Sequence, residues 1–105
     1  LHYAQMKRPF DNLLSEYRDR IDQVDSEIIA LLEKRVGIIR EVAHIKAEHD
    51  IPSVIPGRVD EVRERAASMA ADRDIDPQVI REIYARLIQY SCDLEDEIKN
   101  KLGAA

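Results

Sequence analysis

One long segment dominates the sequence: residues 11–50 read DNLLSEYRDRIDQVDSEIIALLEKRVGIIREVAHIKAEHD. Apolar side chains recur along it every three or four residues, apart from position 35, and we call this row the seam: Leu14, Tyr17, Ile21, Val24, Ile28, Leu31, Ile38, Val42 and Ile45. The spacing predicts one helix of about 40 residues, roughly 60 Å long at ~1.5 Å per residue. That length exceeds the diameter of a compact domain of 105 residues, so we expect the helix to pair with a second chain.

The composition favours a helical, cytoplasmic protein. The chain is 45% apolar and 35% charged, with three Gly, no Trp and no strand-like alternation. Its one cysteine, Cys92, excludes an intramolecular disulfide framework, and its spacing to the three histidines suggests no zinc motif, so we expect no metal site. No apolar run approaches the ~20 residues of a membrane span. The net charge of -5 disfavours nucleic acid as the main partner.

Two more helices are predicted after the long one, which makes the fold all-α. Prolines 52 and 56 predict a short, stiff loop, followed by a short helix from about Arg58 to Asp72. Asp76-Pro77 is a typical helix start, with Asp as the N-cap and Pro at the first helical position, and Gly103 is expected to end this third, medium-length helix.

The domain boundaries follow from these elements. Residues 1–10 are expected to be a leader or additional segment, with Met6 a plausible native start. Asp11 is an N-cap candidate for the long helix. Residues 11–102 are expected to form a single helical domain.

Cations interrupt the apolar pattern of the long helix. Arg35 occupies a seam position, and Lys46 follows 11 residues later on almost the same face, ~16 Å along the axis. Such side chains can also reach solvent or pair with a core carboxylate. Arg18 precedes Arg35 by 17 residues, ~25 Å away, and cannot join them within one subunit. If two long helices pair antiparallel about a two-fold axis, however, Arg18 of one chain approaches Lys46 of the other.

Polar residues also interrupt the later helices. Ser91 and Glu95 are an i, i+4 pair within the apolar stripe of the third helix. A buried Glu is costly unless it is paired or protonated, so a structural salt bridge to a core cation is the alternative to a catalytic role. Arg58 opens the second helix, where a cation and outward-pointing N–H groups together favour an anion.

These residues carry a family resemblance. YRDRIDQVD at 17–25, LLEKR at 31–35 and IK at 45–46 precede a proline-bearing loop, Arg58 and a helix with Ser91 and Glu95. From about residue 13 to 98 this pattern resembles the all-helical class of chorismate mutases. The resemblance implies an intertwined homodimer in which each active site takes Arg18 from one subunit and the remaining residues from the other: Arg35, Lys46, Arg58, Ser91 and Glu95.

Three positions depart from the usual family pattern. Val59 stands where the family usually has an acidic residue that binds the substrate's 4-hydroxyl, Ile55 replaces a common aspartate, and Glu95 stands where many bacterial members have Gln. The runs PGRV at 56–59 and LED at 94–96 look most like the branch that rearranges 4-amino-4-deoxychorismate toward 4-aminophenylalanine-derived antibiotics. Removing a carboxylate at position 59 does not itself favour an ammonium, so this preference rests on the resemblance.

The implied reaction is a cofactor-free [3,3] rearrangement of an enolpyruvyl ether. It requires a flexible diacid to be held in a chair, with charge stabilised as the ether bond breaks. We assign Arg18 and Arg35 to the two carboxylates, Lys46 to the ether oxygen, and Arg58 and Ser91 to the ring side and a carboxylate. Glu95 can assist only in its protonated form, so activity is expected to fall as the pH rises.

Two alternatives to a mutase of chorismate or its 4-amino analogue remain open. An isochorismate-pyruvate lyase could use the same pocket, because an apolar residue at the Val59 position also occurs in that group. A non-catalytic helical dimerisation module would tolerate Arg35→Ala, which repairs the apolar seam, whereas an enzyme would lose activity with its fold retained.

Overall fold

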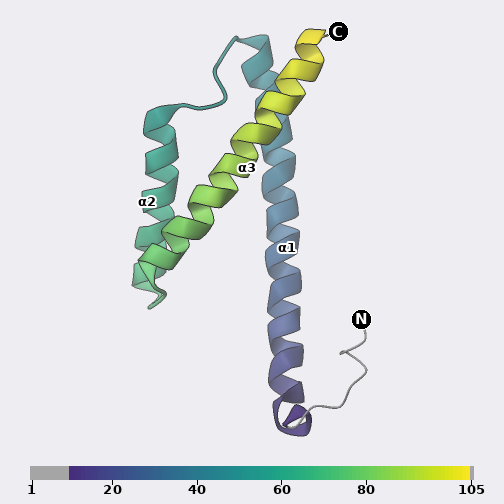
Figure 1. Ribbon diagram of the computed structural model, residues 1–105, viewed down its shortest axis with the longest axis vertical. Helices are drawn as coiled ribbons and strands as arrows, with labels where there is room; N and C mark the ends of the chain where they lie inside the picture. Colours follow the sequence, from purple (N-terminus) through teal and green to yellow (C-terminus); the bar gives the residue numbers. More distant parts are fainter. Residues whose placement is uncertain (1–9, 105) are drawn as a thin grey trace. The chain divides into compact units, whose positions relative to one another are not determined.

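The computed structural model describes residues 10–104, so most of the expected leader, residues 1–9, lies outside the described residues. Within this range the chain forms three helices and no strand: α1 (Asp11–Glu48), α2 (Pro56–Asp72) and α3 (Pro77–Ala104) (Figure 1). They contain 38, 17 and 28 residues respectively, in the predicted order of one long, one short and one medium helix. The all-α prediction is confirmed.

One of the three predicted helix starts is shifted, and one predicted N-cap is wrong. Helix α2 begins at Pro56, two residues before the predicted Arg58, because Pro at the first helical position has no N–H that needs a partner. Asp11 is the first residue of α1 rather than its N-cap, and its carboxylate accepts a hydrogen bond from Arg18. The third prediction is confirmed, since α3 begins at Pro77 and the Gln78 amide donates to Asp76 Oδ1 over 2.9 Å.

Helices α1 and α2 end with the same backbone motif. After α1, Asp50 adopts a φ of 57° and the Ile51 amide donates back to Lys46 O over 2.8 Å. After α2, Asp74 adopts a φ of 60° and the Ile75 amide donates to Ala70 O over 2.9 Å. Both are Schellman motifs with aspartate at the left-handed position that glycine usually occupies. Helix α3 has no such stop at Gly103 and continues to Ala104.

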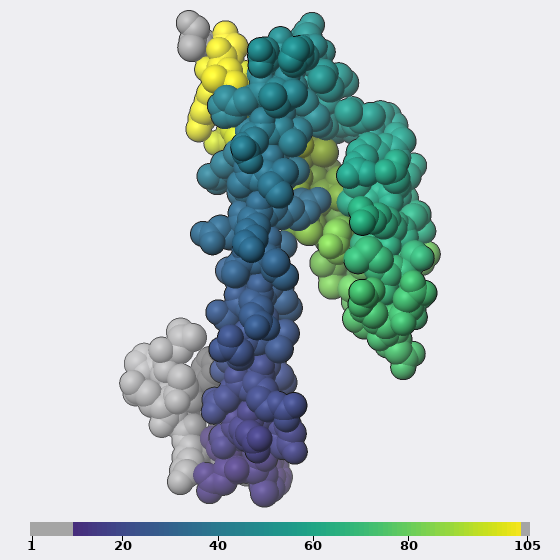
Figure 2. Space-filling model, turned by 180° about the vertical axis from the view of Figure 1, so that it is seen from behind, coloured from purple at the N-terminus to yellow at the C-terminus, as the bar shows by residue number. Residues whose placement is uncertain are grey.

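The chain divides after Arg35 into two compact units. In the first unit, the N-terminal part of α1 is a single column of side chains (Figure 2). Its seam is exposed: the fractions are 41% for Leu14, 59% for Ile21 and 48% for Ile28. A row of large apolar side chains left in water is typical of a helix that is completed by a partner.

The second unit is built around the packing of α2 against α3 (Figure 1). The buried side chains of α2 are small, Ala66, Ala67 and Ala70, which allows a close approach between helices. On α3 the buried residues are Ile88 and Cys92 together with Ser91 and Glu95, whereas Ile83 is 53% exposed. The two polar residues that interrupt the predicted apolar stripe of this helix thus lie on its buried face.

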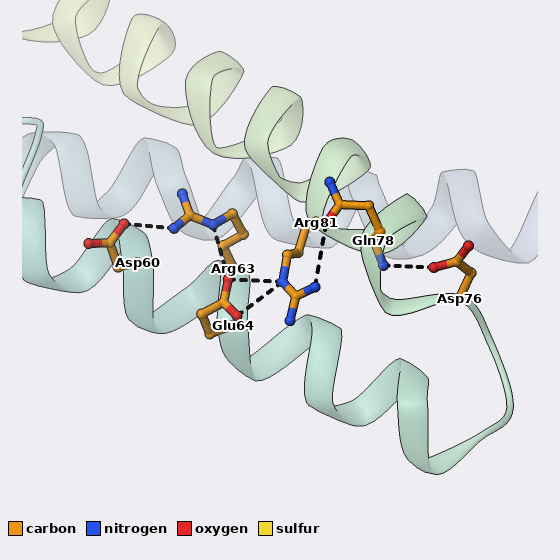
Figure 3. A network of polar contacts seen from close by, with 6 residues as sticks. All are labelled: Asp60, Arg63, Glu64, Asp76, Gln78 and Arg81. Carbon is orange, nitrogen blue, oxygen red and sulfur yellow. Dashed lines mark hydrogen bonds and ion pairs between the residues drawn. The ribbon is translucent and has the colours of Figure 1, made fainter.

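An exposed network of ion pairs also joins α2 to α3 (Figure 3). Arg81 Nε lies 3.0 Å from Glu64 Oε1, and Arg63 bridges Glu64 and Asp60 on α2. Hydrogen bonds from Arg81 and Arg63 lower the pKa of Glu64, so any stability from this network is lost as the pH falls through that pKa. Exposed ion pairs contribute little to the free energy of unfolding. We therefore infer that this network helps to set how α2 and α3 align with one another, and that it adds little stability.

The left-handed residue at the end of α2 predicts the relative stability of two substitutions. Asp74→Gly should be more stable than Asp74→Ala by about 1 kcal/mol, because both changes remove the same charge but only glycine lacks the Cβ that strains the left-handed conformation. Urea unfolding followed by circular dichroism at a fixed protein concentration measures the difference. Equal stabilities would contradict the assignment of strain to this residue.

Candidate active site

The candidate site is centred on a buried ion pair between the end of α1 and the middle of α3. Lys46 Nζ lies 2.6 Å from Glu95 Oε1, and the two side chains are only 13% and 5% exposed. Within the described part of the chain, Glu95 Oε1 has no hydrogen-bond partner besides this ion pair. The salt bridge to a core cation considered from the sequence is therefore present, and it joins two of the predicted catalytic residues.

The same ammonium also binds the loop between α1 and α2. Lys46 Nζ donates to Ser53 O over 2.9 Å, and the thiol of Cys92 lies 3.9 Å from the same carbonyl oxygen. Two residues earlier, Ile51 O accepts a hydrogen bond of 2.7 Å from Lys99 Nζ on α3. The loop is thus attached to its neighbours through its own backbone carbonyl groups.

Ser91 lies one helical turn before Glu95 on α3. Its side chain is buried, and its hydroxyl donates to Leu87 O over 3.0 Å. This back-bond to the preceding turn is common for a serine within a helix. The second unit therefore contains Lys46, Ser91 and Glu95, all buried or half-buried and with Lys46 and Glu95 in direct contact.

The start of α2 differs from the prediction of an open anion site. The amides of Arg58 and Val59 donate to Ile55 O over 3.0 and 3.1 Å, so these two N–H groups are already engaged within the first helical turn. The Arg58 guanidinium is exposed and pairs with Glu61 at 2.5 Å. Val59 is half-buried, while Ile55 is exposed at the cap position.

The two remaining predicted cations belong to the first unit. Arg18 is half-buried and pairs with Asp11 seven residues earlier, two turns away on the same helix. Arg35 is half-buried on α1 at the end of this unit. Arg18 and Arg35 thus both lie on the long helix, as the sequence pattern predicts.

Sequence reasoning missed the residues that hold the loop. The contribution of Ser53 is a backbone carbonyl, for which a sequence carries no signal. Lys99 is different, because it follows Glu95 by four residues and so lies on the same helical face. That spacing could have identified it. Cys92 also lies about one turn from Glu95.

Residues 10–104 contain neither a metal-binding cluster nor a membrane-spanning helix. No group of three or more His, Cys, Asp or Glu side chains in this range is arranged to hold a metal ion. None of the three helices is both long enough and apolar enough to cross a membrane.

The electrostatics of the site predict slow chemistry at Cys92. Burial raises the pKa of the Cys92 thiol, and the negative charge of Glu95 raises it further. Alkylation by iodoacetamide should therefore reach half of its maximal rate at a higher pH in the native protein than in urea, where the thiol pKa is about 8.5. Glu95→Gln should shift the native profile to lower pH and leave the profile in urea unchanged. Identical native and unfolded profiles would be inconsistent with this effect.

Known proteins match this chain over most of its length. A family model described as chorismate mutase type II matches residues 17–96, well over half of the chain. A 4-amino-4-deoxychorismate mutase of Streptomyces pristinaespiralis is 34% identical over 84 residues, which cover 80% of this chain and 65% of the relative. One from Streptomyces venezuelae is 30% identical over 90 residues, covering 86% and 87% respectively.

A third relative has a different name from these two. The chorismate mutase of Methanocaldococcus jannaschii is 28% identical over 92 residues, which cover 84% of this chain and 93% of that protein. The matched range of the family includes every candidate site residue named above, from Arg18 to Glu95. The chain therefore belongs to the chorismate mutase type II family and is an enzyme of the isomerase class.

Proposed function

We propose that this protein catalyses the [3,3] rearrangement of 4-amino-4-deoxychorismate to 4-amino-4-deoxyprephenate. The observation that carries the proposal is the buried Lys46–Glu95 pair, one turn from Ser91, in a chain of the chorismate mutase family. The choice of the amino substrate is supported by the names of the two Streptomyces relatives.

Lys46 is the group that stabilises charge on the ether oxygen. An ammonium carries three N–H groups, of which one is directed to Ser53 O and a second lies against Glu95. A third donor can therefore meet the ether oxygen, where negative charge develops as the carbon–oxygen bond breaks. Because the ammonium is already oriented by two acceptors, little reorganisation is needed in the transition state.

The arginines bind the two carboxylates of the substrate. Arg18 and Arg35 present planar guanidinium groups that can each hold a carboxylate with two hydrogen bonds, and Arg58 with Ser91 completes the ring side. Arg18 and Arg58 pair with carboxylates of their own helices, and both side chains are partly exposed, 40% and 57%. Pairs of this kind are worth only ~0–1 kcal/mol, so a substrate carboxylate can replace them.

Glu95 has a role that depends on its protonation. An ionised carboxylate beside the ether oxygen would repel the developing charge, whereas a protonated carboxyl group donates a hydrogen bond to it. The ion-pair partner of Glu95 is Lys46, so both groups lie at the same point of the site. In the proposed reaction both donate to the ether oxygen, Lys46 through its third N–H group and Glu95 through the proton of its carboxyl group.

The enzyme acts as a homodimer in which the long helices exchange contacts. The exposed side chains of the α1 seam provide the apolar surface that a second copy would cover, including Tyr17 at 56%, Leu31 at 63% and Ile38 at 58%. An antiparallel, two-fold arrangement brings Arg18 of one copy toward Lys46 of the other. Each active site then takes Arg18 from one subunit and its other residues from the partner.

The substrate preference can be measured directly. We expect purified protein to convert 4-amino-4-deoxychorismate with a higher kcat/KM than chorismate, and to release little pyruvate from isochorismate. Val59→Glu should shift the preference toward chorismate, because it restores an acceptor for the 4-hydroxyl; Val59→Leu is the matched control and should not. Product identification by mass spectrometry distinguishes the three reactions.

Other outcomes of this comparison are equally informative. A preference for chorismate in the parent would contradict the amino-substrate assignment and leave the mutase activity intact. Pyruvate release from isochorismate as the main reaction would replace the proposal by the lyase, the second candidate that an apolar Val59 favours. Inactivity toward all three compounds would reject the proposed reaction.

The shared active site predicts complementation between inactive variants. Arg18→Ala and Lys46→Ala should each be inactive alone, but when they are unfolded and refolded together about a quarter of the parent activity should return. Half of the dimers are then mixed, and each mixed dimer has one intact site.

The matched control combines two residues that one subunit supplies to the same site. Arg35→Ala mixed with Lys46→Ala should restore no activity, since every site in every dimer lacks one of the two side chains. Recovery in this control, or no recovery in the first mixture, would contradict the shared-site arrangement.

A further inference from the structure

We propose that Lys99 is a positioning residue that orients Lys46 by holding the α1–α2 loop. The proposal rests on the proposed function, in which the Lys46 ammonium meets the ether oxygen. Lys99 itself is not placed in contact with the substrate. It acts on residues 49–55, which we call the clamped loop.

The clamped loop is fixed at two neighbouring carbonyl groups. Lys99 Nζ donates to Ile51 O over 2.7 Å, and Lys46 Nζ donates to Ser53 O over 2.9 Å. Pro52 lies between the two and restricts the backbone that connects them. A shift of Ile51 O is therefore transmitted to Ser53 O across a short and stiff segment.

Ile51 is held from both sides. Its amide donates to Lys46 O over 2.8 Å as part of the motif that ends α1, and its carbonyl accepts from Lys99. The left-handed residue Asp50 precedes it. Without Lys99 only the amide contact would remain, and the peptide plane could rotate away from α3.

The residues of α3 that contact the clamped loop lie on the same helical face as Glu95. Cys92, Glu95 and Lys99 are separated by three and four residues, so their side chains lie above one another. Glu95 contacts the Lys46 ammonium directly, while Cys92 and Lys99 contact the backbone of the loop that Lys46 binds. The Lys46 side chain is long and flexible, so the position of its charge depends on these acceptors.

The test compares Lys99→Met with Lys101→Met in the full chain. Lys101 is an exposed lysine of the same helix, paired with Glu97 at 3.2 Å, so both variants lose one charge and the terminal nitrogen while keeping an unbranched, flexible side chain. We expect Lys99→Met to lower kcat on the order of 10-fold, with KM changed by less than about twofold, because misplacement of Lys46 acts on the transition state. Lys101→Met should match the parent.

A second measurement tests whether the clamped loop is held in place, and it does not depend on an activity assay. Hydrogen exchange of the backbone amides at residues 49–54 should be faster in Lys99→Met than in Lys101→Met, while amides in the middle of α3 exchange equally in both. If Lys99→Met fails to fold, Lys99→Gln serves the same comparison, because its shorter side chain cannot bridge to Ile51 O.

Each result decides the proposal. Unchanged exchange in the clamped loop, or a loosened loop with parental kcat, would overturn it, and a rise in KM alone would assign Lys99 to substrate binding instead. If the parent converts none of the three candidate compounds, the proposed function fails separately. The exchange comparison then decides whether Lys99 holds the loop.

Discussion

The second unit depends on the contacts of the Lys46 ammonium group. This group joins three segments at once, since it is carried by α1, contacts a carboxylate of α3 and binds a carbonyl of the connecting loop. A buried charge is costly without a charged partner, so removing the Glu95 carboxylate would leave the Lys46 ammonium with only a backbone carbonyl. The contacts that stabilise this part of the fold also fix the position of a cation, which is what the proposed rearrangement needs.

Most of the fold follows from sequence periodicity and from helix boundary signals. Apolar spacing predicts α1 correctly to within two residues of its end, and Asp76-Pro77 predicts the start of α3. The details of the helix ends that the sequence does not predict are decided by local backbone geometry. Pro56 can begin α2 without a side-chain cap, and aspartate rather than glycine takes the left-handed position after α1 and α2.

The candidate site was predictable in part. Interruptions of the apolar stripes identify Lys46, Ser91 and Glu95 as inward-facing, because a polar side chain at such a position needs a partner. The pattern could not assign those partners: Glu95 contacts Lys46, and Ser91 donates to the carbonyl of its own helix. The contacts of the clamped loop were beyond sequence reasoning, since they involve the carbonyl groups that every residue possesses.

This dependence on carbonyl groups has an evolutionary consequence. Because the clamped loop is recognised through its backbone, mutations that exchange the side chains of Ile51 or Val54 need not disturb the contacts made by Lys46 and Lys99. Ile55, at the end of the clamped loop, and Val59, in the first turn of α2, are not among the residues that make these contacts. Substitutions at these two positions can therefore change the proposed substrate preference without rebuilding the contacts that hold the cation.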